Sequence, residues 1–185
     1  MDSAERALVE RARAGDREAF NALAAIHLDR MYATATLVLH DRALAEDAVQ
    51  EALIRAWRDL PALRDPTRVG AWLRRLLVRA CYDESRRRRR SVSSTSLHAL
   101  DVAEDPSSTM LERDVLDRAF RRLTVEHRTS IVLRHFLDLT VPDIADAMRV
   151  PLGTAKSRIH HAERALRAAL EADERLAADA RGNAS

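Results

Sequence analysis

The chain has 185 residues, enough for one medium domain or two small ones, so internal signals must decide the domain count. Glycine (4), proline (5) and aromatic residues (4%) are scarce, whereas alanine, leucine, arginine and glutamate are abundant. Because these four residue types lose least on entering a helix, the composition predicts an all-α protein. One cysteine excludes an internal disulfide, and no apolar run approaches the roughly 18 residues that span a bilayer, so a cytoplasmic protein without membrane insertion is expected.

The net charge of +2 hides an uneven distribution of basic residues. Residues 61–90 carry ten basic and three acidic side chains, whereas residues 1–60 carry eight basic and eleven acidic ones. A short basic band in a near-neutral chain favours binding to a polyanion such as a nucleic acid, because the release of counterions condensed on its phosphates drives binding. A solvated basic face is the alternative interpretation of the band.

Three helices are expected in the first half of the chain. The first begins after Asp16, whose carboxylate can cap free backbone amides. Its apolar stripe is predicted to be Phe20, Leu23, Ala24 and Ile26. The second lies within residues 37–61 and ends at Pro61, with an inner face of Leu44, Ala48, Val49, Ala52, Leu53, Ala56 and Trp57. The third runs from about Ala71 through the arginines of residues 86–90.

Residues 91–111 interrupt this helical pattern. They combine serine, threonine and acidic residues with little periodic apolar character, so they bury too little surface to offset the entropy of ordering. They predict a flexible linker. Helical periodicity resumes near Leu111, and the chain is therefore expected to form two small helical domains, residues 1–90 and 112–175, followed by a tail of residues 176–185.

The sharpest local pattern is TVPDIADAMRVPLGTAKSRIHHAERAL, residues 140–166. The segment Arg149-Val150-Pro151 ends one helix, and Gly153-Thr154 opens another. The facing apolar residues are predicted to be Ile144, Ala145 and Met148 on the first helix and Ala155, Ile159 and Ala162 on the second. This spacing is typical of a helix-turn-helix. The outer face of the second helix offers donors for phosphates and base edges, namely Thr154, Lys156, Ser157, Arg158, His160, His161 and Arg164. A helical hairpin with a charged exterior is the alternative.

Three segments together resemble the extracytoplasmic-function (ECF) group of the sigma-70 family. TAKSRIHHAERAL looks like the recognition helix, LAEDAVQEALIRAWRDL resembles the segment that grips the polymerase clamp, and AWLRRLLVRACYDESRRRRR looks like the promoter-melting region. They occur in the expected order and spacing. The resemblance implies a region 2-like domain and a region 4-like helix-turn-helix domain that direct core RNA polymerase to promoters, without a cofactor or enzymatic activity.

The resemblance also implies roles for individual residues. Docking on the coiled-coil clamp of the polymerase's largest subunit falls to Asp47, Gln50, Glu51 and Arg55, although a solvated helix face would look similar. Recognition and melting of the minus-ten element falls to the loop of residues 63–70 and the next helix, with Arg68, Trp72, Arg75, Arg79, Asp83 and Arg86. A helical tryptophan such as Trp72 more often belongs to the core. The recognition helix would read the minus-thirty-five duplex.

The chain departs from the family pattern at several positions. Arg79 stands where asparagine is common, which favours a phosphate contact over a base contact. His161 and Glu163 stand where arginine is frequent, so the promoter sequence does not transfer from relatives. Arg149 replaces a common turn glycine, at a cost of about 1 kcal/mol in a left-handed conformation.

Two other functions remain open from the sequence, and metal binding and thiol chemistry also have to be considered. A conventional regulator would show a self-complementary apolar face in residues 1–60, and a protein that merely titrates another factor would not need both basic segments. An anti-sigma partner that covers the docking surfaces is a further hypothesis. His160 and His161 lack a cysteine or carboxylate at ligand spacing, so no metal site is predicted. Cys81 is expected to pack among apolar neighbours, with thiol sensing as the alternative.

Overall fold

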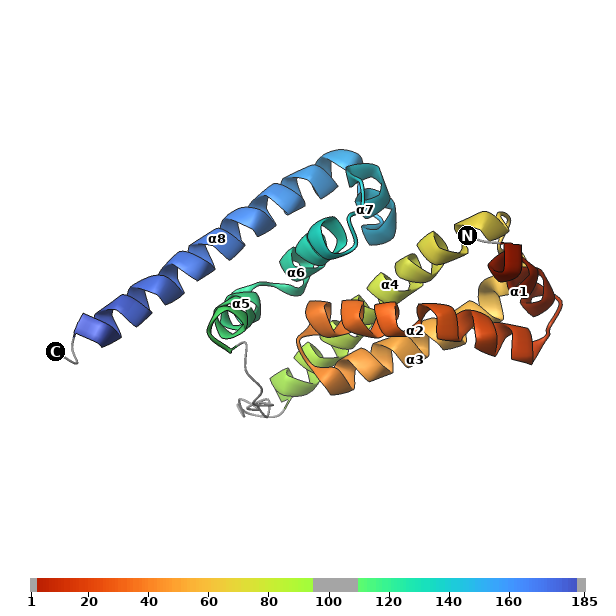
Figure 1. Ribbon diagram of the computed structural model, residues 1–185, viewed down its shortest axis with the longest axis horizontal. Helices are drawn as coiled ribbons and strands as arrows, with labels where there is room; N and C mark the ends of the chain where they lie inside the picture. Colours follow the sequence, from red (N-terminus) through yellow and green to blue (C-terminus); the bar gives the residue numbers. More distant parts are fainter. Residues whose placement is uncertain (1–2, 95–109, 183–185) are drawn as a thin grey trace. The chain divides into compact units, whose positions relative to one another are not determined.

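The computed structural model describes residues 3–94 and 110–182, and the regular structure in these ranges is entirely helical (Figure 1). The chain divides into two compact units, with α1–α4 forming the body of one and α5–α8 that of the other. The prediction of an all-α protein is confirmed. Most of the predicted linker falls outside the described residues, since α4 ends at Ser94 and α5 begins at Met110. None of the described helices is long and apolar enough to cross a membrane.

The N-terminal unit begins with α1 (Ser3–Arg13) and α2 (Arg17–Leu39). The predicted cap of α2 is confirmed, because the Ala19 amide donates a hydrogen bond to Asp16 Oδ1 at 3.0 Å. Leu23 is buried as predicted, but Ile26 is 55% exposed. The buried side chains of α2 recur about every four residues from position 19, and position 26 lies off this stripe. The prediction for Ile26 is therefore wrong.

The next helix, α3, spans Arg42–Asp59, so the first residues of the predicted 37–61 stretch belong to α2. The break lies at His40, whose φ of 56° is left-handed, and Asp41 then caps α3 by accepting from the Leu44 amide at 3.0 Å. The helix ends before a short turn, η1 (Leu60–Ala62), where Pro61 was predicted to end it. Of the predicted inner face, Ala48, Val49, Ala52 and Ala56 are buried, while Leu44, Leu53 and Trp57 are half-buried.

A second short turn, η2 (Pro66–Arg68), leads into α4 (Val69–Ser94), which packs against α2 and α3. Leu73, Leu77 and Cys81 of α4 lie in the core of this unit. Alanines on α3 leave room for the close approach of α4. Burial raises the pKa of the Cys81 thiol to about 12, so at neutral pH the side chain is a packed, protonated thiol and not the thiolate that redox sensing requires.

The C-terminal unit contains α5 (Met110–Arg122), α6 (Val125–Ile131), the π-helical turn η3 (Val132–Phe136), α7 (Val141–Met148) and α8 (Leu152–Gly182). Helix α8 packs against both α5 and α6. Leu123, Ile131 and Ala162 form a buried cluster at this junction. Because α8 continues to Gly182, most of the predicted tail is a continuation of the recognition helix.

A buried carboxylate joins α5 to the C-terminal half of α8. The side chain of Asp173 is 3% exposed, and its oxygens lie 2.6 Å from Arg122 Nη2 and 3.4 Å from Arg118 Nε. Both guanidinium groups are about half exposed, so they shield the carboxylate while remaining hydrated. This ionic contact was not predicted from the sequence, because a single aspartate on a helix carries no signal of burial.

Candidate nucleic-acid and protein interfaces

The turn between α7 and α8 has the geometry of a Schellman motif. The Val150 amide donates to the Ala145 carbonyl at 3.0 Å, and the Arg149 amide donates to the Asp146 carbonyl at 3.2 Å. Arg149 has a φ of 53°, so this non-glycine residue occupies the left-handed position that the sequence predicted for it. Pro151 follows and precedes the first residue of α8. The turn thus fixes the angle between the two helices.

The predicted facing surfaces of α7 and α8 are buried. Ile144, Ala155 and Ala162 are 0% exposed, and Ala145, Met148 and Ile159 are at most 8% exposed. The small side chains of Ala145 and Ala155 allow the two helices to cross closely. The described geometry is therefore that of a helix-turn-helix, with the opposite face of α8 left toward solvent.

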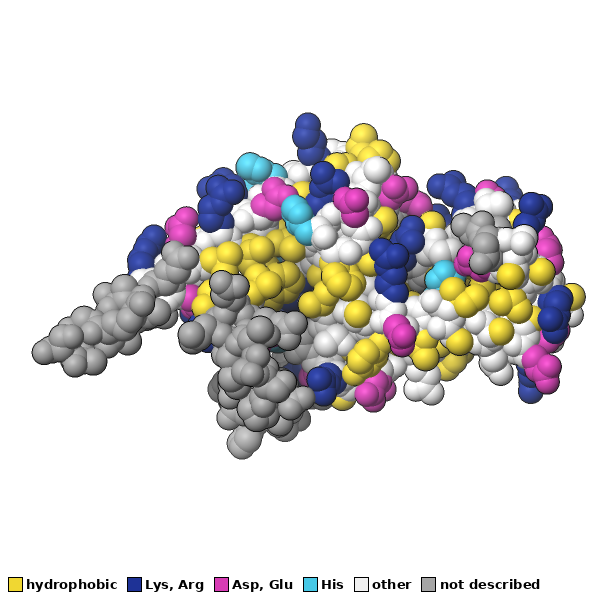
Figure 2. Space-filling view, viewed as in Figure 1, with side chains coloured by type: hydrophobic (Ala, Val, Ile, Leu, Met, Phe, Trp, Pro, Cys, Tyr) yellow, Lys and Arg dark blue, Asp and Glu magenta, His cyan; other side chains and the backbone are white. Residues whose placement is uncertain are grey.

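That outer face carries the residues predicted to contact DNA. Lys156, Ser157, His160, His161 and Arg164 are exposed, while Thr154 and Arg158 are half-buried. Basic and histidine side chains, with acidic ones among them, lie along the α8 side of this unit in Figure 2. Ser157 Oγ donates to the Thr154 carbonyl at 3.0 Å, which holds this hydroxyl against its own helix. Polar donors on an exposed helix face suit the major groove.

Glu163 interrupts the positive charge of this face, on the side of α8 nearest to η3. Its carboxylate lies 3.0 Å from the His135 imidazole, so the two side chains form a hydrogen bond that becomes an ion pair when the histidine is protonated. Both side chains are well exposed, at 42% and 57%. The pair occupies the opposite flank of α8 from Arg158 and His161.

The predicted docking face on α3 is only partly free. Asp47 and Gln50 are exposed, but Arg55 donates to Glu51 at 2.7 Å and contacts Asp83 of α4 at 3.0 Å. Burial alone would lower the pKa of Arg55, but these two carboxylates outweigh it and raise the pKa. Arg55 therefore ties α3 to α4, and Asp83, which was predicted to contact the minus-ten strand, is its partner.

An open apolar groove of about 730 Å³ lies between α2 and α3, beside Gln50. The rings of Phe20 and Trp57 meet edge to face on its wall, with centroids 5.1 Å apart. Leu28 and Ile54, which also line it, are 42% and 56% exposed. Sequence reasoning missed this groove, although Ile54 falls outside the buried stripe of α3 and is a large apolar residue on a polar face.

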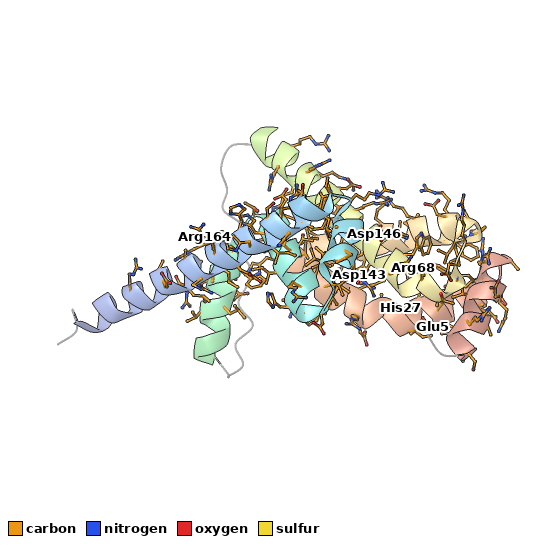
Figure 3. All side chains as sticks on the ribbon, turned by 90° about the horizontal axis from the view of Figure 1, so that it is seen from above. Glu5, His27, Arg68, Asp143, Asp146 and Arg164 are labelled. Carbon is orange, nitrogen blue, oxygen red and sulfur yellow. The ribbon has the colours of Figure 1, made fainter. Side chains whose placement is uncertain are left out.

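The predicted minus-ten loop is ordered by its own hydrogen bonds. The backbone amide and the hydroxyl of Thr67 donate to Asp65 Oδ1 at 3.0 and 2.6 Å. Leu63 and Val69 are buried and anchor the two ends of the loop. Arg68 at its tip is exposed (Figure 3).

Helix α1, which sequence analysis did not predict, supports this loop. It contacts both η1 and η2, and its Glu5 lies 3.0 Å from the imidazole of His27 on α2 (Figure 3). A Cβ at Gly70 would lie 3.6 Å from the same imidazole. The end of the loop is thus in contact with α2, and α2 with α1.

Two arginines of the basic band of residues 61–90 pair with carboxylates of their own unit, and one of these pairs links α4 to the start of α3. Arg87 pairs with Glu84, and Arg88 pairs with Asp41, the cap of α3. Arg86 stays exposed. Trp72, Arg75, Arg79 and Asp83 are half-buried, so Trp72 is neither a fully buried core residue nor a freely exposed platform. The structure gathers the predicted minus-ten residues along η2 and α4.

Comparisons with known proteins match both units. Residues 23–91 match the family model for Sigma-70 region 2, and residues 113–166 match that for Sigma-70, region 4. The RNA polymerase sigma-H factor of Pseudomonas aeruginosa is 32% identical over 178 residues, which cover 89% of this chain and 92% of that protein. The ECF RNA polymerase sigma factor SigL of Mycobacterium tuberculosis is 33% identical over 170 residues, covering 89% and 96%.

A solved structure is also similar to the chain. The sigma factor RpoE from Bartonella quintana, crystallised in complex with the anti-sigma factor NepR, superposes with a TM-score of 0.70 at 26% sequence identity. The match covers 83% of this chain and 98% of that one.

Proposed function

The chain belongs to the extracytoplasmic-function group of the sigma-70 family, whose members direct core RNA polymerase to specific promoters and start transcription, and we propose how its two units divide this task. The α1–α4 unit, within residues 1–90, docks on polymerase and holds the melted minus-ten strand. The α5–α8 unit, within residues 112–175, reads the minus-thirty-five duplex. As a sigma factor the chain is not an enzyme; it acts by binding, in the cytoplasm where polymerase works.

The helix-turn-helix carries the minus-thirty-five assignment. Six facing residues of α7 and α8 are buried, which leaves the polar face of α8 available to a major groove about 12 Å wide. The exposed donors Lys156, Ser157 and His160 lie near the start of this helix, where recognition helices contact base edges. These features support reading of a duplex by this unit.

Docking on the polymerase clamp is assigned to Asp47 and Gln50 together with the rim of the α2–α3 groove. Exposed charges at an interface fix register, while well-packed apolar side chains supply most of the affinity. Ile54, exposed between the polar residues and the groove, is the apolar anchor in this proposal. Glu51 and Arg55 act indirectly, by holding α3 against α4 through Asp83.

The minus-ten strand is assigned to the loop carrying Arg68 and to the exposed side of α4. A base leaves the stack at a lower cost when basic and aromatic side chains receive the single strand. Arg68 and Arg86 are exposed, and the aromatic Trp72 is half-buried on α4. Arg75 and Arg79 complete a row of basic residues on α4. They are assigned to phosphate groups of the strand, so these contacts do not depend on which bases are present.

Core-dependent transcription tests the docking proposal. Run-off assays on a library of promoter fragments would use purified core polymerase with the wild-type chain, with the triple variant Asp47→Ala, Gln50→Ala, Ile54→Ala, and with the control Arg42→Ala. Arg42 is exposed on the same helix but lies away from the docking residues. We expect the triple variant to reduce initiation at least about tenfold, which corresponds to 1.4 kcal/mol, and the control to match the wild type.

Two results would contradict the proposal. Equal losses in the triple variant and in Arg42→Ala would place the docking surface elsewhere on the chain. Unchanged binding of the triple variant to core polymerase, with loss of promoter opening alone, would assign these residues to DNA rather than to polymerase.

We also propose that an anti-sigma factor regulates this chain. RpoE, its structural neighbour, is known in complex with such a protein, and the open groove between α2 and α3 offers apolar surface next to the polymerase-docking residues. A protein recovered with this chain from its native cells should be displaced by core polymerase. Recovery of the chain alone and in fully active form would contradict this proposal.

A further inference from the structure

Helix α1 has a buried face and contacts α2 and the two short turns that flank the minus-ten loop of residues 63–70. Val9 and Ala12 on this face are 0% and 2% exposed. Glu5 precedes Val9 by four residues, so its carboxylate lies on the same face, and its side chain is 15% exposed. A carboxylate in such a position needs hydrogen-bond donors, because burial of an unpaired charge is costly.

His27 of α2 supplies such a donor. Its Nε2 atom lies 3.0 Å from Glu5 Oε1, and its side chain is 22% exposed (Figure 3). His27 lies four residues from each of Leu23 and Met31, which are buried, so it occupies a position of α2 that an apolar side chain would also fill. A hydrogen bond differs from apolar packing because it is directional. The pair therefore restricts how far α1 can slide along α2.

The same imidazole ring lies next to the end of the minus-ten loop. A Cβ atom at Gly70 would lie 3.6 Å from His27 Cε1. Gly70 follows Val69, which is buried, and is two residues from the exposed Arg68. One ring thus lies between α1 and the end of the loop that carries Arg68.

A charge effect also connects α1 to the start of the loop. Hydrogen bonds from the hydroxyl and the amide of Thr67 lower the pKa of Asp65. The positive charges of Arg68 and of Arg6, which belongs to α1, lower this pKa further. Helix α1 therefore acts on the loop at two points, at Asp65 near its start and through His27 at its end.

We infer that His27 is a positioning residue for capture of the minus-ten strand. With Glu5 it holds α1 and the end of the loop in register, and it thereby sets the position of Arg68. The inference rests on the minus-ten role proposed for the N-terminal unit. His27 itself does not touch DNA; it acts through Gly70 and the loop. Sequence analysis did not include His27 among the minus-ten residues.

The strength of this contact should depend on pH. An imidazole ordinarily gains its proton between pH 8 and 5, and a protonated ring forms an ion pair with a carboxylate where a neutral ring forms only a hydrogen bond. Glu5 faces His27 from α1, and Arg30 lies one turn along α2. From α4, Arg74 Nη1 lies 3.8 Å from the same Cβ position at Gly70. In the described part of the chain no charged residue of α3 pairs with His27. The pair should therefore be stronger at pH 6 and weaken as the pH rises to 8.

Binding of a single strand by the reconstituted holoenzyme tests the inference. The probe is a fluorescent oligonucleotide with the non-template minus-ten sequence selected with the wild-type holoenzyme, and a second oligonucleotide carries the same bases in scrambled order. We expect His27→Ala to weaken binding of the selected strand about fivefold at pH 6 and about twofold at pH 8, the range for one hydrogen bond. Binding of the scrambled strand should change less, and affinity for core polymerase should equal that of the wild type.

Conservative variants distinguish positioning from a loss of packing. His27→Gln keeps a donor toward Glu5 but no charge, so it should bind at both pH values as the wild type does at pH 8. Glu5→Gln should reduce the pH dependence as well, and the losses in Glu5→Ala and His27→Ala should not add in the double variant. Glu10→Ala removes a more exposed pair with Arg13 on the same helix and should leave binding unchanged. Circular dichroism checks that each variant is folded.

The outcomes separate this inference from the proposed function. Wild-type binding of the selected strand by His27→Ala would overturn it. An equal ratio of wild-type to His27→Gln affinity at pH 6 and pH 8 would also overturn it, and so would an equal loss in Glu10→Ala, which would assign the effect to the stability of α1 as a whole. Failure of the wild-type holoenzyme to prefer the selected strand over the scrambled one would instead contradict the minus-ten role proposed for the N-terminal unit.

Discussion

Helices α3 and α4 of the N-terminal unit meet through alanines and aliphatic side chains, whereas α5 and α8 of the C-terminal unit also meet through a buried carboxylate. In the first unit Ala52 and Leu77 are almost fully buried, and the ion pair of Arg55 with Asp83 lies at the edge, where both side chains reach water. In the second unit Asp173 is 3% exposed between two arginines.

The two kinds of contact constrain a helix differently. The stabilisation from apolar burial is non-directional and roughly proportional to the area removed from water. The cost of truncating a buried apolar side chain therefore depends on the volume of the cavity that it leaves. A buried ion pair is directional, and removing one partner costs more than the pair itself contributes. The position of α8 along α5 therefore depends on one carboxylate as well as on apolar packing, while the packing of α4 is shared among many apolar side chains.

The largest effect is expected from Leu77→Ala in the apolar unit. Leu77 is 1% exposed, so truncation should leave a cavity and lower the free energy of unfolding by about 2–5 kcal/mol. Ile26→Ala in the same unit is the control, because this side chain is 55% exposed and should change stability by at most about 0.5 kcal/mol. Denaturant unfolding measures both. Similar values for the two variants would mean that the core lies elsewhere.

Asp173→Ala tests the ionic contact. We expect a loss of about 2 kcal/mol, below the 3–5 kcal/mol typical of a fully buried pair, because Arg118 and Arg122 are about half exposed and regain hydration. Glu171→Ala removes an exposed pair with Arg175 and should cost about 0.3–0.5 kcal/mol, an amount that salt reduces further. Thermal unfolding at low and high salt distinguishes them. Equal losses of stability in the two variants would show that the burial of Asp173 does not increase its contribution to stability.

Replacing either of two glycines by alanine should change the free energy of unfolding, with opposite signs at the two positions. Gly15 precedes the N-cap of α2, and Gly153 lies in the first turn of α8. Gly15 has a φ of +92°, so Gly15→Ala should destabilise the chain by about 1 kcal/mol although no atom lies within 4 Å of the added methyl group. Gly153 lies in α8 with the same free space and no left-handed strain, so Gly153→Ala should stabilise it by about 0.5 kcal/mol. Melting temperatures of the two variants give the signs directly.

The exposed cap Asp16 should show the smallest effect and a dependence on pH. The Ala19 amide, and then Arg11, lower the pKa of this carboxyl below 3.8. A lowered pKa in the folded state means that the charged carboxylate contributes stability above its ordinary pKa and loses it as the pH falls through the folded value. Asp16→Asn keeps an acceptor but no charge. The stability difference from the wild type should therefore shrink below about pH 4, and a constant difference would contradict this account.

Local signals predicted much of this fold. The cap at Asp16, the end of α3 before Pro61 and the facing residues of α7 and α8 follow from short-range chemistry. The break at His40 had a signal too, since Asp41 is a favourable cap, but the helical periodicity on both sides obscured it. The left-handed turn at Arg149 was predicted from the pattern of relatives and not from the residue itself.

Contacts between distant residues could not be predicted in this way. Arg55 and Asp83 were given different partners, although in the structure they bind each other. Ile26 was not distinguished from the core residues of its helix, and Ile54 was not distinguished from its polar neighbours. The exposure of each depends on which side of the helix the rest of the unit covers. His127 lines a groove together with residues of α8, and that neighbourhood exists only because α6 packs against α8. The roles of the docking, minus-ten and recognition residues stay predictions until the assays are done.

Cys81 gives the N-terminal unit a built-in kinetic reporter. It is the single cysteine of the chain, and its thiol is 1% exposed. A disulfide reagent can react with it only during the moments when α4 separates from its neighbours. The rate of labelling under native conditions therefore measures how often this unit opens, with no engineered label. Polymerase bound to the unit would slow the reaction by the factor by which it suppresses opening.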